Sequence, residues 1–236
     1  MGLFSDAPRY GGVFYRSFSQ CMDSPDINLF FGEGSVAQAG ICGGATIVWI
    51  RYYLSHEGMY SNKILSRETS TIEMLQSALA YRDQGLSQLF IDKGIMMVRP
   101  FHYNGKSVSS ADAMEVSHLV SVSHGISIFS YYHRALGPHV VAAYVDRTKR
   151  LFFFDANQGD VSIPYPGSFQ WLHSYINLFL QQTAWFKVTH FEPCWNEGRF
   201  QQCLAELTAD AEKGFPQMRL RARRLREGVV ERETTL

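Results

Sequence analysis

Cysteine is scarce in this chain, and so is any excess of charge of one sign. The 236 residues contain 4 cysteines, and these lack the close paired spacing that a zinc site or a disulfide scaffold requires. We therefore expect free thiols in a reducing compartment, with no metal and no cofactor. Lys plus Arg number 22 and Asp plus Glu number 22, so the net charge is zero and no nucleic acid partner is expected.

Long apolar runs are also missing. No window approaches the roughly 18 apolar residues of a membrane span, and the amino terminus has no basic segment followed by an apolar one. We expect neither membrane contact nor a cleaved signal peptide. A myristoylation signal at Gly2 is not expected either, because position 6 is Asp rather than Ser or Thr.

What the chain does contain is material for a core. Hydrophobic residues make up 46% and aromatic residues 14%, enough for one large domain, which we expect to be a monomer. Residues 1–37 are rich in Gly, Ser and Pro and predict a flexible lead-in. Residues 38–195 predict the folded domain, and residues 196–236 a C-terminal helix followed by a basic tail.

The apolar patterns predict an α+β fold. Residues 43–54 are apolar on nearly every face, which indicates a buried helix. Short runs rich in β-branched and aromatic residues indicate an antiparallel sheet with one helical crossover, and we expect the buried helix to pack on it with other helices flanking. Strands are expected at 126–132, 140–145, 151–154 and 185–191. Further helices are expected from Ser70 or Thr71 to about 82, at 111–119, at 200–213, and after Gly167 with Ser168 as its cap, while 87–93 is expected to be helical or irregular. Turns are expected around Pro100 and Asn104-Gly105.

One histidine and one aspartate are predicted to meet at one end of a strand hairpin. His139 opens the first strand and Asp155 closes the second, while the turn at 146–149 folds one strand back on the other. An aspartate beside an imidazole can orient that ring as a general base.

Cys42 supplies the nucleophile that such a pair needs. It stands at the predicted start of the buried helix, in Gly40-Ile-Cys42-Gly-Gly, where the helix dipole and an imidazolium would lower the pKa of its thiol. We expect the glycines to allow a sharp turn and to leave room for a substrate chain. The Cys42 amide, and with less geometric basis the Gln38 side chain, are candidate donors to an oxyanion.

Each of these residues has an ordinary structural interpretation when it is taken alone. Cys42 fits a buried structural cysteine, His139 a histidine at a sheet edge, and Asp155 a turn residue after a strand. Their joint order and spacing favour a Cys-His-Asp triad.

The residues around the triad resemble the YopT/AvrPphB-type effector cysteine proteases, within the papain-like group. The resemblance rests on Gly40-Ile-Cys42-Gly-Gly with Trp49, on Gly137-Pro-His139-Val, and on Phe154-Asp155-Ala-Asn157-Gln-Gly159. It implies a papain-like catalytic domain over 38–195, with Cys42 as nucleophile, His139 as base and acid, and Asp155 as orienting carboxylate. It also implies secretion by a bacterium and cleavage of a host protein, such as a small GTPase or a kinase, in the host cytoplasm.

Two other functions remain open at this point. The same triad can carry out glutamine deamidation or transglutamination through a thioacyl intermediate. A binding module that has lost catalysis and kept the fold is the third possibility, although the three intact positions argue against it.

Overall fold

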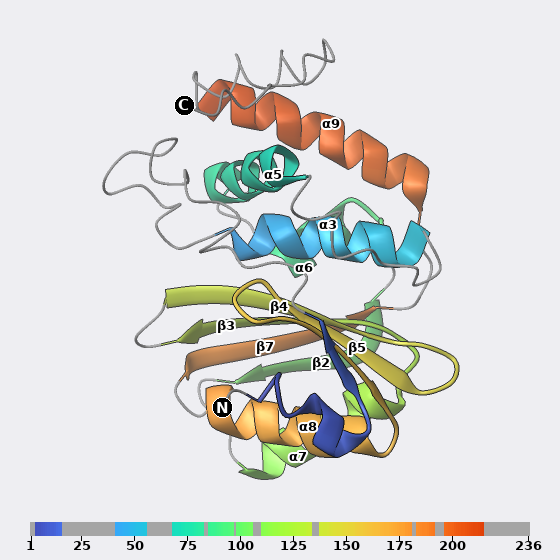
Figure 1. Cartoon of the computed structure of the whole chain (residues 1–236). Helices are drawn as coiled ribbons and strands as arrows, with labels where there is room; N and C mark the ends of the chain where they lie inside the picture. The colour runs from blue at the N-terminus through green and yellow to red at the C-terminus, as the bar shows by residue number, and fades with distance from the viewer. Residues whose placement is uncertain are drawn as a thin grey trace, which may run out of the picture.

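The computed structural model describes residues 3–15, 41–55, 68–82, 85–96, 98–105, 110–133, 137–180, 183–191 and 196–214. Within these ranges the chain forms one seven-stranded sheet with helices on both faces (Figure 1). The strand order is β1-β6-β5-β4-β3-β7-β2, and every neighbouring pair is antiparallel. The expected α+β architecture, a buried helix on an antiparallel sheet with flanking helices, is confirmed.

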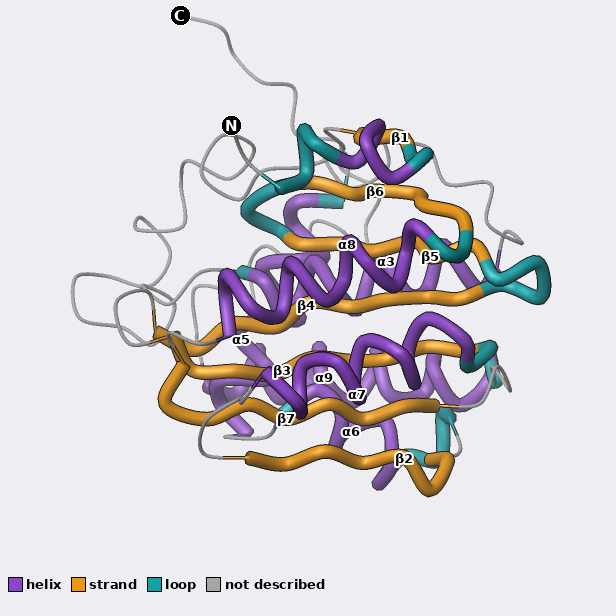
Figure 2. The backbone as a smooth tube through the Cα atoms, turned by 90° about the horizontal axis from the view of Figure 1, so that it is seen from below, coloured by secondary structure: helices purple, strands orange, loops and turns teal. Residues whose placement is uncertain are grey.

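The sheet is assembled from hairpins joined by helical connections. Its strands are β1 (Val13–Tyr15), β2 (Val98–Gly105), β3 (Gly125–His133), β4 (Gly137–Val145), β5 (Arg150–Asp155), β6 (Gly159–Pro164) and β7 (Thr183–Phe191). Consecutive strands β3 to β6 are neighbours in the sheet, whereas β7 returns to lie between β3 and β2 (Figure 2). That return runs through a helix, and so do the connections from β1 to β2 and from β2 to β3, so the described chain contains two helical connections more than the sequence predicted.

Two helical layers cover the sheet (Figure 1). One face carries α3 (Cys42–Ser55), with α5 (Thr69–Arg82), α6 (Leu86–Asp92) and α9 (Glu197–Gly214) beyond it or beside it. The other face carries α7 (Ser110–Val122), α8 (Gly167–Tyr175), its π-helical continuation η3 (Ile176–Leu180) and the short 3₁₀ helix η1 (Ala7–Tyr10). No helix among the described residues is long and apolar enough to span a membrane.

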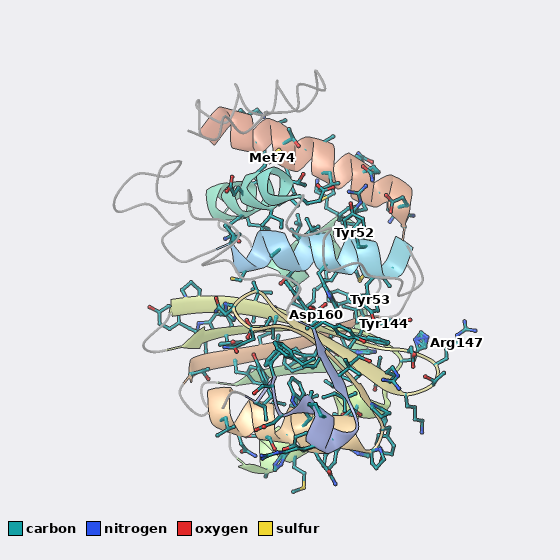
Figure 3. All side chains as sticks on the ribbon, viewed as in Figure 1. Tyr52, Tyr53, Met74, Tyr144, Arg147 and Asp160 are labelled. Atoms are coloured by element: carbon teal, nitrogen blue, oxygen red, sulfur yellow. The ribbon has the colours of Figure 1, made fainter. Side chains whose placement is uncertain are left out.

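Alternation along the strands separates the core into two clusters. Ala142 and Phe154 pack under α3, whereas their chain neighbours Ala143 and Phe153 pack against α7 and α8. Tyr53 of α3 contacts Tyr144 of β4, with ring centroids 5.3 Å apart, and both side chains lie between α3 and the sheet (Figure 3). The helix is buried on nearly all sides, as its apolar sequence predicts, because α5 covers the side that the sheet leaves open.

The first residues are not the flexible lead-in that we expected for 1–37. Residues 3–15 form η1 and β1, and β1 pairs with β6. Phe4 is buried and contacts Trp171 edge to face at 5.3 Å, while the Trp171 indole N–H donates to the Leu3 carbonyl at 3.1 Å. A few apolar side chains within a Gly-rich stretch are thus enough to attach it to the core. Residues 16–37 lie outside the described ranges.

The C-terminal helix belongs to the same core as the rest. α9 packs on α5, and its side chains Phe200, Cys203 and Leu207 are buried in the cluster that includes α3. The boundary expected at 195/196 therefore does not separate two cores. The basic tail lies outside the described residues.

β2 occupies a region in which we predicted turns. Pro100 and Asn104-Gly105 are residues typical of turns, but β2 is an edge strand, and its register shifts between Val98 and His102. Proline is tolerated at such irregular edge positions because the missing N–H costs no ladder hydrogen bond there.

The predicted cap of α8 is also wrong. Pro166 is the N-cap residue, no side chain bonds to the first turn, and Ser168 is buried inside the helix. Burial of the apolar face, which includes Trp171 and Leu172, therefore stabilises this helix without a serine cap.

Candidate active site

Cys42 is the first residue of α3, as the sequence predicted. Its side chain is 5% exposed, and it lies where the positive end of the helix dipole favours a thiolate. One turn further on, the Thr46 hydroxyl donates to the Val140 carbonyl at 3.4 Å. This bond holds the start of α3 against β4, the strand that carries His139.

The glycines after Cys42 serve helix packing and not substrate access, which corrects our expectation. A Cβ on Gly44 would lie 2.1 Å from the Ile72 carbonyl oxygen of α5, and one on Gly43 would lie 2.9 Å from Gln76 Oε1 and from Leu79 Cδ1. The Gly44 amide donates to Gln76 Oε1 at 3.1 Å. α5 therefore lies against the first turn of α3 and satisfies one of its amides.

His139 and Asp155 meet at the end of the hairpin formed by β4 and β5. The Nε2 atom of His139 lies 2.9 Å from Asp155 Oδ1, and the two side chains are 7% and 3% exposed. The turn between the strands has the expected form, since Asp146 Oδ1 accepts from the amides of Thr148 and Arg150. The side chains of His139 and Asp155 therefore meet at the same end of the hairpin, as the sequence predicted.

Asp155 is held by further donors. Its Oδ1 also accepts the Asn157 amide at 2.8 Å, and its Oδ2 accepts the Tyr175 hydroxyl at 3.2 Å. A buried carboxylate with these partners is an acceptor in a defined orientation. It fixes Nε2 of His139 as the protonated nitrogen and leaves Nδ1 for the thiol.

Cys42 and His139 form a hydrogen-bonded pair whose two pKa values move in opposite directions. Burial raises the pKa of Cys42, but the charge of His139 and hydrogen bonds with its ring and with the Val140 backbone outweigh burial, so the pKa of the thiol is lowered. Burial lowers the pKa of His139, yet the charges of Asp155 and Cys42 and hydrogen bonds with both raise it well above its usual value. The pair is therefore suited to exist as thiolate and imidazolium.

Other residues singled out in the sequence have different places. Gln38 lies outside the described residues, so its suggested part in an oxyanion site stays a prediction. Cys203 is not in a disulfide and is buried between α9 and the core, far along the chain from the hairpin. In the part of the chain that the structure describes, no group of three or more His, Cys, Asp or Glu side chains could hold a metal ion.

Sequence reasoning missed the tyrosines that surround Asp155. Tyr175 is one of the residues that predicted the apolar stripe of α8, and Tyr131 is one residue of a predicted strand. The Tyr175 hydroxyl bonds to the carboxylate, and the Tyr131 hydroxyl lies 3.3 Å from that of Tyr175, only because α8 and β3 pack together in the fold. No sequence spacing indicates that contact.

Comparison with known proteins finds similar structures but no similar sequence. No protein family and no curated protein match the sequence. The avirulence protein AvrPphB of Pseudomonas superposes with a TM-score of 0.44 and 17% identity, over 64% of this chain and 91% of its own. A ubiquitin-specific protease encoded by a murine cytomegalovirus tegument protein, solved with a ubiquitin-based suicide substrate, superposes with a TM-score of 0.41 and 11% identity, over 85% of this chain and 94% of its own.

Proposed function

We propose that the protein is a thiol endopeptidase of papain-like type, with Cys42 as nucleophile, His139 as base and acid, and Asp155 as orienting carboxylate. One observation carries the proposal. The buried ring of His139 is hydrogen-bonded to the Cys42 thiol and to the Asp155 carboxylate at the same time. A buried structural histidine needs no such pair of partners, whereas in nucleophilic catalysis by a thiol the base contacts the thiol and is oriented by a third group.

The acylation step follows from this geometry. The Cys42 thiolate attacks the carbonyl carbon of a peptide bond, and a C–S bond forms while the carbonyl oxygen takes the negative charge. The His139 imidazolium then gives its proton to the amide nitrogen, the C–N bond breaks, and the amine product leaves. Cys42 remains acylated as a thioester.

Deacylation uses the same groups in reverse. The neutral His139 ring accepts a proton from water as the oxygen attacks the thioester carbonyl. The C–S bond breaks, the acid product leaves, and the thiolate and imidazolium are restored. Asp155 keeps the ring oriented and stabilises its charge throughout.

The first turn of α3 is the site at which the oxyanion would be stabilised. The Gly44 amide is already bonded to Gln76, and the Ala45 amide is bonded to the Ile41 carbonyl at 3.0 Å. We assign the donor role to the Cys42 amide, which the nucleophile itself carries at the positive end of the helix dipole.

An apolar surface beside the triad suits the substrate chain. Tyr132 of β3 lies in register between Pro138 of β4 and Trp185 of β7, so the three side chains form a row on one face of the sheet. Tyr132 is 41% exposed and Trp185 is 39% exposed, and Pro138 directly precedes His139. We assign this row to the substrate polypeptide next to the scissile bond, because it is exposed and apolar and its Pro138 adjoins His139 along β4.

Delivery and target are part of the proposal as well. The three motifs that resemble bacterial effector proteases support secretion from a bacterium and action on a host protein in the host cytoplasm. A small GTPase or a kinase is the expected class of substrate.

The test compares new protein amino termini in eukaryotic cell lysate after incubation with the wild type and with Cys42→Ala. Expected are specific new termini with the wild type and none with the variant. Cys203→Ala, which alters another buried cysteine, is the matched control and should cleave like the wild type. A lysate in which the wild type creates no new termini, and in which Cys42 reacts with alkylating reagents no faster than Cys203, contradicts the proposal.

The same samples distinguish the alternative chemistry. Deamidation would raise the mass of a glutamine peptide by about one dalton, and transglutamination would create a cross-link, both without a new terminus. A non-catalytic binding module would leave the lysate unchanged and would retain its biological effect in Cys42→Ala.

A further inference from the structure

We propose that Tyr175 and Tyr131 form a hydrogen-bonded pair that orients Asp155 and moderates its charge, and thereby sets the pH range in which Cys42 and His139 are reactive. The inference rests on the proposed thiol chemistry and goes beyond it. Both tyrosines are positioning residues, since they act on the reacting groups through the carboxylate.

The two oxygens of Asp155 have different partners. Oδ1 accepts from His139 Nε2 at 2.9 Å and from the Asn157 amide at 2.8 Å, both on or near the hairpin. Oδ2 accepts from Tyr175 at 3.2 Å, and Tyr175 belongs to α8, on the opposite side of the carboxylate group. His139 and Asn157 bind only Oδ1 and would leave the carboxylate able to rotate. Tyr175 limits that rotation because it binds Oδ2.

The second tyrosine extends the chain of hydrogen bonds. The Tyr131 and Tyr175 hydroxyl groups lie 3.3 Å apart. An ionised carboxylate only accepts, so Tyr175 donates to Asp155 and Tyr131 donates to Tyr175. Burial, together with the charge of Asp155, raises the pKa of both tyrosines well above its usual value, which keeps both protonated as donors.

Tyr131 also contacts the base itself. It is the cross-strand partner of His139, and the two rings meet edge to face with centroids 5.4 Å apart. Tyr131 and Tyr175 are 4% and 0% exposed, so water does not replace either hydroxyl as a donor. The His139 ring is thus held between a carboxylate and a tyrosine that are joined through Tyr175.

A consequence follows for the reacting pair. Removing the Tyr175 hydroxyl leaves more negative charge on the carboxylate. That charge raises the pKa of His139 and acts in the same direction on Cys42. The whole range in which thiolate and imidazolium coexist therefore moves to higher pH.

The experiment measures the rate at which iodoacetate alkylates Cys42, located by mass spectrometry, from pH 4 to pH 10. The anionic reagent reacts best with the thiolate–imidazolium form, so the profile has an acid limb and an alkaline limb. In Tyr175→Phe we expect both limbs to move up by about half a pH unit, equivalent to roughly a threefold rate change on each limb. Tyr131→Phe should shift them in the same direction by less.

The double variant supplies a readout that packing alone would not give. Because Tyr131 acts through Tyr175, Tyr131→Phe added to Tyr175→Phe should produce no further shift. Tyr53→Phe removes a buried hydroxyl on the other face of the sheet and should leave both limbs in place.

The outcomes separate this inference from the proposed function. A wild type without a reactive Cys42 contradicts the protease proposal itself. A reactive wild type whose limbs stay unmoved in Tyr175→Phe, or whose rate falls equally at every pH, overturns the tyrosine pair alone. If Tyr175→Phe fails to fold by circular dichroism, the Tyr131→Phe profile decides in the same way.

Discussion

The ring of Phe154 stacks on the indole of Trp49, with centroids 5.6 Å apart and 11° between the planes. Phe154 directly precedes Asp155 on β5, and Trp49 lies two helical turns after Cys42 on α3. Both side chains are fully buried. This contact fixes the helix that carries the thiol relative to the strand that carries the carboxylate, so packing in the core sets the distances at the site.

Replacing His139 should slow alkylation of Cys42 most strongly at low pH. Burial alone raises the pKa of the thiol, and His139 is the main influence that lowers it. In His139→Ala we expect the rate at pH 6 to fall by about tenfold or more, with a smaller difference at pH 10, where any thiol ionises. His173→Ala, a half-buried histidine of α8 that stacks on Phe169, is the control. Equal rates in His139→Ala and the wild type at pH 6 would refute the assigned role.

Replacing Asp155 should lower thermal stability in a pH-dependent way. The pKa of His139 is raised in the folded state, so the stabilisation it provides is fully present below its unfolded pKa, about 6.5, and is lost as the pH rises through the folded value. The difference in Tm between the wild type and Asp155→Ala should therefore be larger at pH 6 than at pH 10.

Asp146→Ala is the matched control for that measurement. Asp146 lies in the turn of the same hairpin, where it accepts hydrogen bonds from Thr148 and Arg150 and not from His139. Its Tm should fall by a similar amount at both pH values. If the difference in Tm between the wild type and Asp155→Ala were larger at pH 10 than at pH 6, it would contradict the raised pKa of His139.

Gly44→Ala should destabilise the protein although alanine is the better helix former. The new Cβ would lie 2.1 Å from the Ile72 carbonyl oxygen, which belongs to backbone and cannot move without shifting α5. We expect a loss of about 1–3 kcal/mol, against the gain of roughly 0.5–1 kcal/mol that helix propensity alone predicts. Urea unfolding of Gly44→Ala and of the wild type measures the difference in their free energies of unfolding.

Gly43→Ala is the comparison for that variant. Its Cβ would meet only Gln76 Oε1 and Leu79 Cδ1, the ends of flexible side chains, at 2.9 Å. It should be less destabilised than Gly44→Ala. The reverse order would mean that α5 is not held against the first turn of α3 in this way.

Trp185→Thr should weaken substrate binding with little effect on folding. The side chain is 39% exposed, so the free energy of unfolding should change by no more than about 0.5 kcal/mol. KM for the cleaved protein should rise several-fold while kcat stays near the wild-type value. Leu178→Thr, at a residue 60% exposed on η3, is the control and should leave KM unchanged. An unchanged KM in Trp185→Thr would remove the row of Pro138, Tyr132 and Trp185 from the substrate site.

Local sequence patterns predicted the elements whose signals are strong. The helix that starts at Cys42, the strands of the central hairpins and the turn after Asp146 follow from apolar periodicity and turn residues, which act over a few positions. β1, β2 and β6 were missed because β1 is very short, β2 contains turn-type residues, and β6 has no alternating pattern, being almost completely buried. Edge position and burial depend on neighbours in the sheet, which no local pattern reports.

The sequence by itself determined which residues could carry out thiol chemistry, namely Cys42 at a helix start and His139 and Asp155 at the ends of two strands. Only the tertiary structure decided that Gly44 serves the contact with α5, that Tyr175 reaches the carboxylate with Tyr131 behind it, and that Phe154 stacks on Trp49. The physical reason is that the first set depends on residue type and local backbone, whereas the second depends on side chains brought together across the sheet from distant parts of the chain. Those contacts exist only when burial of both core clusters brings α3 and α8 onto opposite faces of the same strands.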